Sequence, residues 1–234
     1  MITISNAYWN IGERKKNEDS LSLLDISLLK KHLLVGIVAD GIGSFHNGEE
    51  ASGYLIEELI SLILDEIVPF LNKGYGLHKA RKPIFRKLYK VSEAFLDISK
   101  YRNENMGTTL SMLLLYKNQF MVINLGDSMI MKIKRKRVKE LSVKHVNPDG
   151  SINKCVGSLG YFEPSVKTGY ISKNTAFLIA SDGFYRKISD IMYIFDPREI
   201  ENESQIEKRL AEAARWAKSL GEKDNMSAIY IKCF

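Results

Sequence analysis

Three apolar segments of the chain each end in an aspartate that stands beside a glycine. They are LVGIVADG, MVINLGDS and AFLIASDG, which contain Asp40, Asp127 and Asp182. An apolar run of this length is typical of a buried strand, so its last carboxylate emerges at the edge of a core. Two more acidic positions flank strand-like runs, Glu18-Asp19 and Asp224. The chain must therefore fold so that several buried strands carry carboxylates at their ends.

Strand-like segments occur in runs, and helical segments separate these runs. We expect strands at residues 2–8, 20–28, 33–39, 108–116, 119–125, 129–134, 137–142, 176–180 and 226–232. We expect helices at residues 48–71, 83–100 and 204–219 and a short one near 188–194. This order favours an α+β layered sandwich over a parallel βαβ fold. Because chains divide into domains beyond roughly 250–300 residues and no linker is visible, we expect a single domain over residues 1–234.

Composition and charge exclude several classes of protein. The most apolar stretch, residues 54–71, contains four acidic residues, whereas a membrane span needs about 20 largely uncharged residues. Residues 1–20 have no long apolar core behind a basic start, so we expect no secretory signal. Cys155 and Cys233 are expected to be plain thiols. The net charge is +6, and the basic run MKIKRKRVKE is interpreted as a solvated hairpin tip rather than a nucleic-acid patch.

The acidic strand ends suggest a metal centre if they converge. Each Asp-Gly pair taken singly is a common turn signal. Carboxylates gathered in a poorly solvated cleft repel one another, and each is driven toward neutrality unless a cation lies between them. Oxygen ligands without histidine or cysteine select magnesium or manganese over zinc. The chemistry therefore predicts an all-oxygen site for Mg²⁺ or Mn²⁺.

Six short motifs in a fixed order resemble the metal-dependent protein phosphatases of type 2C, in their short bacterial form. The chain carries Arg14-Lys15-Lys16-Asn17-Glu18-Asp19-Ser20, VADGIGSFHNGEEAS at residues 38–52, Met106-Gly107-Thr108-Thr109-Leu110, Leu125-Gly126-Asp127-Ser128, Ser181-Asp182-Gly183 and Asp224-Asn225-Met226-Ser227. The resemblance spans residues 14–227. It implies two packed, mainly antiparallel sheets flanked by helix pairs.

The resemblance also implies which residues hold metal. Asp40 would bridge two cations, Mn²⁺ or Mg²⁺, with the carbonyl of Gly41 on the first. Asp182 and Asp224 would ligate the second cation, and Glu18 would hold metal-bound waters, directly or one shell out.

Catalysis by this family implies further roles. Arg14 would clamp the substrate phosphate with its guanidinium fork, beside the catalytic Asp40 and Asp182. Two cations about 3.5–4 Å apart would hold the water that attacks phosphorus in line. Asp127 is expected to orient the turn at its strand end rather than bind metal.

The chain departs from the family pattern at a few positions. The family's aspartate for a third metal ion falls on Glu104, so a third site there is tentative. Ile42 occupies the position of a proposed acid histidine in eukaryotic members, and Phe45, with His46 beside it, replaces a histidine of bacterial members. The variable flap of the family maps to about residues 143–169 and is short here.

Other functions remain as alternatives. A phosphatase-like module that binds partners without turnover would be indicated by loss of the metal aspartates, yet all three are present. A phosphatase of small phosphorylated metabolites stays open. A dinucleotide site is disfavoured because the third glycine of its fingerprint falls on His46. By analogy with the family we expect a monomeric, cytoplasmic enzyme that acts on phosphorylated proteins, such as the substrates of a serine/threonine kinase. We expect neither nucleic acid nor a membrane as a partner.

Overall fold

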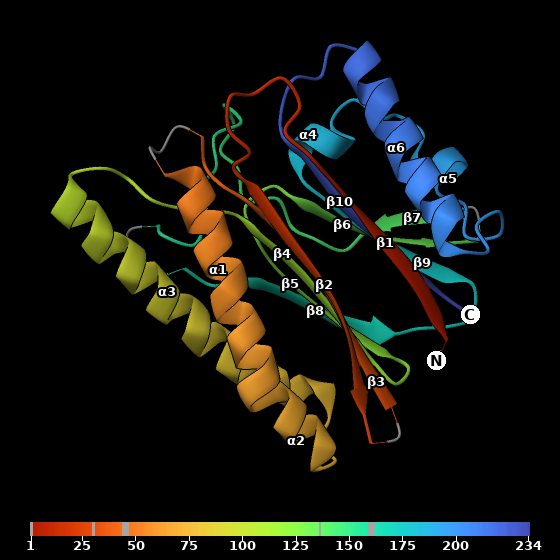
Figure 1. Cartoon of the computed structure of the whole chain (residues 1–234). Coiled ribbons are helices and arrows are strands. Elements are labelled where there is room, and N and C mark those ends of the chain that lie inside the picture. The colour runs from red at the N-terminus through yellow and green to blue at the C-terminus, as the bar shows by residue number, and fades with distance from the viewer. Residues whose placement is uncertain (1, 30, 44–46, 136, 159–161) are drawn as a thin grey trace.

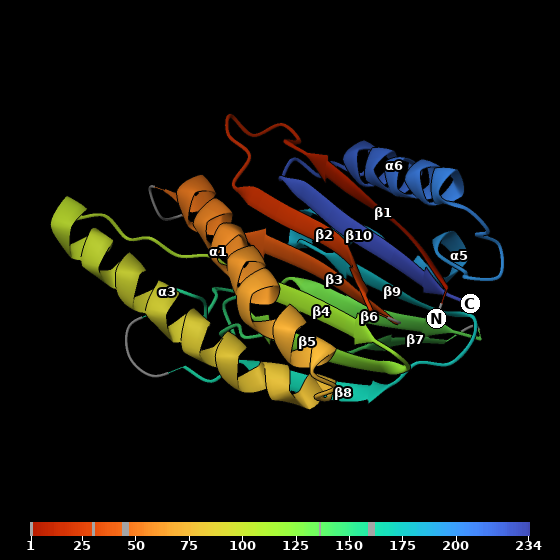
Figure 2. The same cartoon turned by 60° about the horizontal axis from the view of Figure 1, so that its bottom comes forward.

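Two antiparallel sheets packed face to face form the centre of the protein. The computed structural model describes residues 2–29, 31–43, 47–135, 137–158 and 162–234. The described strands form two five-stranded sheets, with the order β1-β10-β9-β6-β7 in sheet A and β2-β3-β4-β5-β8 in sheet B. Every neighbouring pair of strands is antiparallel. Figures 1 and 2 show the two sheets as the middle layers of the molecule.

The chain crosses between the sheets several times, and β2 to β5 follow one another within sheet B. Sheet A consists of β1 (Thr3–Asn10), β10 (Met226–Cys233), β9 (Thr175–Ala180), β6 (Met129–Lys134) and β7 (Arg137–Glu140). Sheet B consists of β2 (Asp19–Leu28), β3 (Lys31–Asp40), β4 (Leu110–Tyr116), β5 (Gln119–Leu125) and β8 (Ser165–Tyr170).

Helices cover the outer face of each sheet. Over sheet B lie α1 (Gly48–Leu62), which continues through a π-helical turn (Ile63–Ile67) into α2 (Val68–Asn72), and α3 (Arg81–Arg102), which follows a 3₁₀ turn (Leu77–Ala80). Over sheet A lie α6 (Glu203–Ser219) and two short helices, α4 (Asp182–Tyr185) and α5 (Ile191–Ile194). Figure 2 shows these helices on opposite sides of the paired sheets. The predicted α+β sandwich of two antiparallel sheets between helical layers is confirmed.

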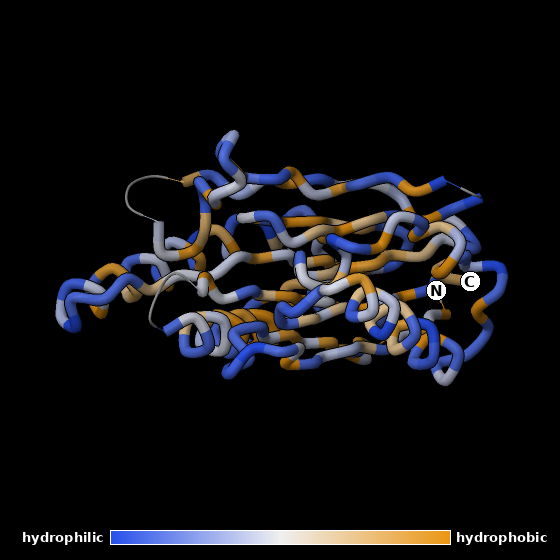
Figure 3. Tube along the Cα trace, turned by 90° about the horizontal axis from the view of Figure 1, so that it is seen from above, coloured by the Kyte–Doolittle hydropathy of each residue, from blue (hydrophilic) through white to orange (hydrophobic). Residues whose placement is uncertain are grey.

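Alternation along the strands divides the apolar residues among three buried clusters. On β3, Leu34 and Val38 face sheet A, where they pack with residues such as Ile179 and Ile229. The intervening Val35 and Ile37 instead join the cluster under α1 and α3, as the two-residue period of a strand requires. A third cluster lies between sheet A and α6. Figure 3 shows the hydrophobic residues concentrated along the strands. These layers fix the sheets against each other and so fix the positions of their ends.

Several details differ from the sequence-based predictions. The strand β8 was not predicted, because Ser165–Tyr170 carries no apolar run and owes its extended form to pairing with β5. The helix predicted over residues 48–71 is interrupted by the π-helical turn, and the helix predicted to begin at Pro83 begins at Arg81. The turn of helix at α4 was also missed. Within the described chain, no helix has the length and apolar character needed to traverse a lipid bilayer.

Candidate metal centre

The acidic strand ends of both sheets meet at one end of the molecule. On sheet B, β2 begins at Asp19 and β3 ends at Asp40, and the two residues face each other in the antiparallel register. On sheet A, Asp182 follows β9 and begins α4, while Asp224 stands just before β10. Asp127 lies in the turn between β5 and β6. The fold therefore gathers carboxylates from opposite ends of the chain, such as Glu18 and Asp224, at one end of the two sheets.

These strand ends line a cleft of about 1220 Å³. Its lining includes all of the residues predicted to act in catalysis or metal binding, which are Arg14, Glu18, Asp40, Gly41, Glu104, Asp182 and Asp224. The convergence on which the metal hypothesis depends is thus present in the structure, whereas the role of each residue stays a prediction.

A close backbone contact places Asp40 and Glu18 at the start of α1. A Cβ atom on Gly41 would lie 2.2 Å from the carbonyl oxygen of Gly48, so only glycine fits where the chain leaves β3. The Glu18 carboxylate lies against the same backbone, since a Cβ on Gly48 would lie 2.8 Å from one of its oxygens. The backbone N–H of Gly41 donates to the carbonyl of Glu18 at 3.0 Å. The glycines predicted to permit a close approach therefore bring Glu18 beside the end of β3.

Burial and mutual repulsion raise the pKa values of the clustered carboxyls. Loss of solvation raises the pKa of Asp40 well above its usual range, and the charges of Asp19 and Asp182 raise it further. Burial likewise raises the pKa of Asp19 to about 6, and the charges of Asp182 and Asp224 contribute in the same direction. The pKa of Asp182 is also raised to about 6, mainly by burial, although Arg186 lowers it. A cation between these groups would relieve the penalty that each carboxylate imposes on the others.

Two oxygens of the cluster are buried without a partner. Neither Oδ1 of Asp19 nor Oδ1 of Asp127 makes a hydrogen bond to any described part of the chain. The other oxygen of Asp19 accepts a hydrogen bond of 2.8 Å from the Ser181 hydroxyl. Buried polar atoms are normally paired, and the donors here are oxygens, which Mg²⁺ and Mn²⁺ prefer. The chemistry of this donor set fits a divalent cation.

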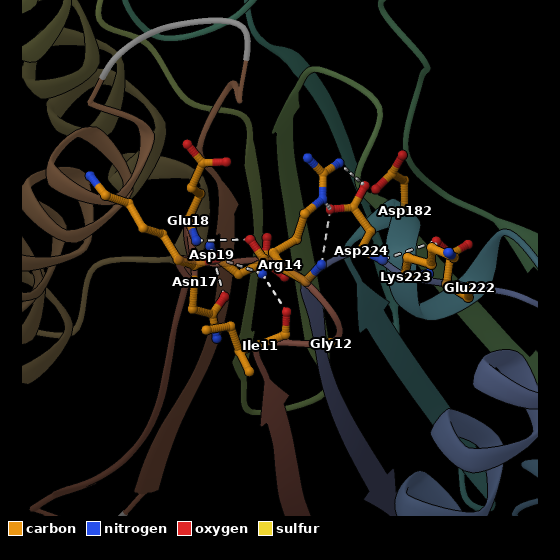
Figure 4. A network of polar contacts seen from close by, with 12 residues as sticks. Ile11, Gly12, Arg14, Asn17, Glu18, Asp19, Asp182, Glu222, Lys223 and Asp224 are labelled. Carbon is orange, nitrogen blue, oxygen red and sulfur yellow. Dashed lines mark hydrogen bonds and ion pairs between the residues drawn. The ribbon is translucent and has the colours of Figure 1, made fainter.

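Two arginines occupy the sheet A side of the cluster. Arg14 donates from Nη2 to Oδ2 of Asp224 at 3.0 Å, and its Nε lies 3.0 Å from Oδ1 of the same carboxylate. Figure 4 shows its guanidinium beside Asp224, between Glu18 and Asp182. Arg186, at the end of α4, donates from Nη1 to Oδ2 of Asp182 at 2.7 Å. Both arginines are therefore paired with carboxylates that the resemblance assigns to the second metal ion.

These ion pairs explain why the carboxylates do not form a closed cage. Among the described residues, no group of three His, Cys, Asp or Glu side chains is arranged to hold an ion directly. Carboxylates repel one another and pair with nearby cations instead. Both oxygens of Asp224 contact the guanidinium of Arg14. Asp224 could ligate an ion only after Arg14 turns away, whereas Oδ1 of Asp182 is not engaged by Arg186.

The remaining predicted positions lie around the same cleft. Glu104 lines it and accepts a hydrogen bond of 3.0 Å from the Asn47 side-chain amide, which fixes one of its oxygens. Ile42 also lines the cleft, so an apolar side chain stands where a proposed acid histidine was considered. Phe45 and His46 lie outside the described residues.

The segment predicted as a flap is joined to the cleft by backbone pairing. Thr108 and Val156 exchange two backbone hydrogen bonds, and Thr108 also bridges to Gly41. The loop that contains Ser151, Asn153 and Ser158 lines the cleft opposite the end of α3, and the segment then continues into β8. The flap-like segment therefore forms one wall of the cleft and is held to the strand beside Asp40.

Sequence reasoning missed three residues of the cluster. Asp19 was noted only as an acidic strand flank, although it is buried beside Asp40. Arg186 and Glu222 were not noted at all, and Arg186 forms a fork with both oxygens of Glu222. A weak signal existed for Arg186, because it follows Asp182 by four residues, a spacing that places two side chains on one helical face.

Fold and site together define an α+β sandwich with an acidic, arginine-flanked cleft at the strand ends. This chain belongs to the protein phosphatase 2C family, whose sequence model matches residues 10–228. No curated protein matches the chain by sequence.

Solved structures show the same fold. The serine/threonine phosphatase of S. agalactiae is 17% identical, with a TM-score of 0.84, and the match covers 100% of each chain. PppA, described as a key regulatory component of T6SS in Pseudomonas aeruginosa, is 21% identical, with a TM-score of 0.79 over 100% of this chain and 99% of that one. The catalytic domain of the serine threonine protein phosphatase PstP, in complex with 2 manganese ions, is 22% identical, with a TM-score of 0.74 over 98% and 97% of the two chains.

Proposed function

We propose that the chain is a metal-dependent serine/threonine protein phosphatase. The observation that carries this proposal is the convergence of carboxylates from both sheets on one cleft beside Arg14. Membership of the protein phosphatase 2C family supports the reaction class. The likeness in fold to PstP with its two manganese ions supports a centre for two divalent cations, Mn²⁺ or Mg²⁺.

Each side of the centre would hold metal with different residues. Asp40 feels the charges of Asp19 on sheet B and of Asp182 beside sheet A and would bridge the ions, with the carbonyl of Gly41 and the carboxylate of Glu18 on the sheet B side. Asp182 and Asp224 would serve the sheet A side. The two ions would supply an activated water for direct hydrolysis of the phosphoester. A third ion at Glu104 remains a weaker part of the proposal, because Asn47 already holds one oxygen of that carboxylate.

Arg14 can pair either with the Asp224 carboxylate or with the phosphate of a substrate. Its side chain is about half exposed, and its two donors form a fork on Asp224. When Asp224 turns to an ion, the same planar fork is free to bind a phosphate dianion, which it matches in geometry. In this proposal Arg14 clamps the substrate phosphate at the mouth of the cleft and aligns phosphorus for attack.

The cleft suits a phosphorylated side chain on a protein. Besides the carboxylates, its lining includes Lys100 and Asn103 at the end of α3 and the loop that contains Asn153. A small metabolite would leave most of this volume unfilled. The proposed partners are phosphoserine and phosphothreonine proteins, such as the targets of a serine/threonine kinase, met by a monomeric enzyme in the cytoplasm.

Hydrolysis assays test this proposal. A phosphothreonine peptide and a generic aryl phosphate are incubated with the protein plus Mn²⁺, with a chelator, and with the Asp182→Asn variant. We expect turnover with Mn²⁺ only and its loss in the variant. Activity that persists in chelator or survives the substitution would refute the mechanism. A panel of phosphometabolites run beside the peptides distinguishes a metabolite phosphatase, and absence of turnover with Mn²⁺ would favour a binding module.

A further inference from the structure

Arg186 is held in the cluster more firmly than Arg14. Its Nε and Nη2 atoms donate to the two oxygens of Glu222 at 3.1 and 2.8 Å, while Nη1 donates to Asp182 at 2.7 Å. The side chain of Glu222 is only 4% exposed. The guanidinium therefore binds Glu222 and Asp182 through different edges, and its Nη2 also lies 3.5 Å from Oδ2 of Asp224.

Glu222 is itself fixed by the backbone that leads to Asp224. Its Oε1 accepts hydrogen bonds from the backbone N–H groups of Lys223 and Asp224 at 3.0 and 3.2 Å, and Figure 4 shows this turn beside Asp182. An ion that displaced Arg186 from Asp182 would leave it paired with Glu222. Arg186 thus keeps its place whether or not Asp182 binds metal.

The position of Arg186 argues against direct contact with substrate. Among the described residues, Arg14 lines the main cleft and Arg186 does not. Arg186 instead borders an adjoining hollow of about 510 Å³ with Glu222 and Lys223, and Arg14 and Asp224 line both this hollow and the main cleft. Its route to the reaction therefore runs through Asp182, whose outer oxygen it binds.

We propose that Arg186, anchored by Glu222, is a positioning residue that fixes the Asp182 carboxylate for metal binding. The guanidinium holds Oδ2 and leaves Oδ1 free of Arg186, so it limits the orientations that the carboxylate can adopt. Partners that orient metal ligands in this way typically change metal affinity by about 10–100-fold when removed. This inference rests on the proposed function, because it assumes that Asp182 is a metal ligand.

The test distinguishes the effect of the planar guanidinium geometry of Arg186 from the effect of its positive charge. Arg186→Lys keeps the positive charge but cannot bind Glu222 and Asp182 through two edges of one rigid group. Mn²⁺ binding to the full chain is measured by calorimetry without substrate, and thermal unfolding of the metal-free protein is measured in parallel. We expect Mn²⁺ affinity to fall by about tenfold in Arg186→Lys.

A matched control is available at Arg198. This arginine also binds both oxygens of a buried carboxylate, that of Asp196, and its side chain is exposed to a similar degree, 51% against 46% for Arg186. It lies outside the residues that line the main cleft. Arg198→Lys should lower the melting temperature about as much as Arg186→Lys and leave Mn²⁺ affinity unchanged.

The possible outcomes are distinct. Equal or tighter Mn²⁺ binding in Arg186→Lys, while the wild-type protein binds Mn²⁺, overturns the role of Arg186 and leaves the proposed function standing. A loss of affinity of the same size in Arg198→Lys also overturns it, since the loss would then reflect stability alone. If the wild-type protein takes up no Mn²⁺, both the role of Arg186 and the metal-dependent function are wrong.

Discussion

The two sides of the acidic cleft differ in how their charges are balanced. On the sheet B side, Asp19 and Asp40 form no ion pair with any described residue, and their pKa values are raised by burial and by neighbouring carboxylates. On the sheet A side, Asp224 pairs with Arg14 and Asp182 pairs with Arg186. The comparison suggests that the sheet B side depends on added cations, whereas the sheet A side carries cations of its own that metal must displace or share.

The largest effect is expected on the side without arginines. Asp40→Asn removes the proposed bridging ligand, so phosphatase activity should fall by more than the roughly 100-fold upper range for an outer-shell partner. The same change removes a buried charge that only other carboxylates face. The metal-free variant should therefore melt at a higher temperature than the metal-free wild type. Steady-state kinetics measure the activity, and thermal unfolding measures the melting temperature. An Asp40→Asn variant that stays active and melts at a lower temperature would contradict both expectations.

The next effect concerns the phosphate rather than the metal. Arg14→Lys keeps the charge at the mouth of the cleft but loses the fork, and a charge-assisted hydrogen bond contributes about 1.5–3 kcal/mol. We expect kcat/KM for a phosphothreonine peptide to fall by roughly 10–100-fold, with Mn²⁺ affinity within about threefold of wild type because Arg14 competes with metal only for Asp224. Steady-state kinetics beside calorimetry measure the two quantities. A loss confined to Mn²⁺ affinity would show that Arg14 serves the metal and not the substrate.

The pH dependence of stability tests the raised carboxyl pKa values on both sides of the cleft. The folded pKa values of Asp19 and Asp182, about 6, lie above the ordinary value of 3.8. Between these values the folded state binds more protons than the unfolded state, so this contribution to stability is present at low pH and is lost as the pH rises to about 6. Chemical unfolding of chelator-treated protein should show that decline, and saturating Mn²⁺ should reverse it at pH 7. The Asp19→Asn variant should show a smaller decline. If the metal-free variant and the metal-free wild type show the same pH dependence of stability between pH 3.8 and about 6, the raised pKa of Asp19 is wrong.

The smallest effect is expected at Glu104. Its carboxylate accepts a partly buried hydrogen bond from Asn47, and a typical intramolecular hydrogen bond contributes about 0.5–1.5 kcal/mol. Glu104→Gln keeps an acceptor oxygen and should change activity by less than roughly fivefold at saturating Mn²⁺. Titration of activity with Mn²⁺ checks this. A large loss, restored by high Mn²⁺, would instead indicate a third ion at Glu104.

The sequence predicted the strand ends well because their signal is local. An apolar run followed by Asp-Gly encodes both a buried strand and a sharp exit, as at Asp40 and Asp182. The strand β8 was missed because its residues alternate weakly and its conformation depends on β5. Tertiary pairing of this kind leaves little trace in a single segment.

The site was predictable in part for the same reason. The predicted ligands Asp40, Asp182 and Asp224 do line one cleft. The contacts of Arg186 with Glu222, however, join residues 36 positions apart, and no local pattern reports such a pair. The burial of Asp19 likewise depends on its register opposite Asp40. Residues that balance charge across elements therefore emerge only once the elements are placed.

Calorimetric titration of the metal-free wild-type protein with Mn²⁺, beside Asp40→Asn, tests the central assertion most directly. If the strand ends of both sheets form one divalent-cation centre, the wild type takes up Mn²⁺ and releases or absorbs measurable heat, and the variant does not. Equal uptake by the two proteins, or none by either, would contradict the account.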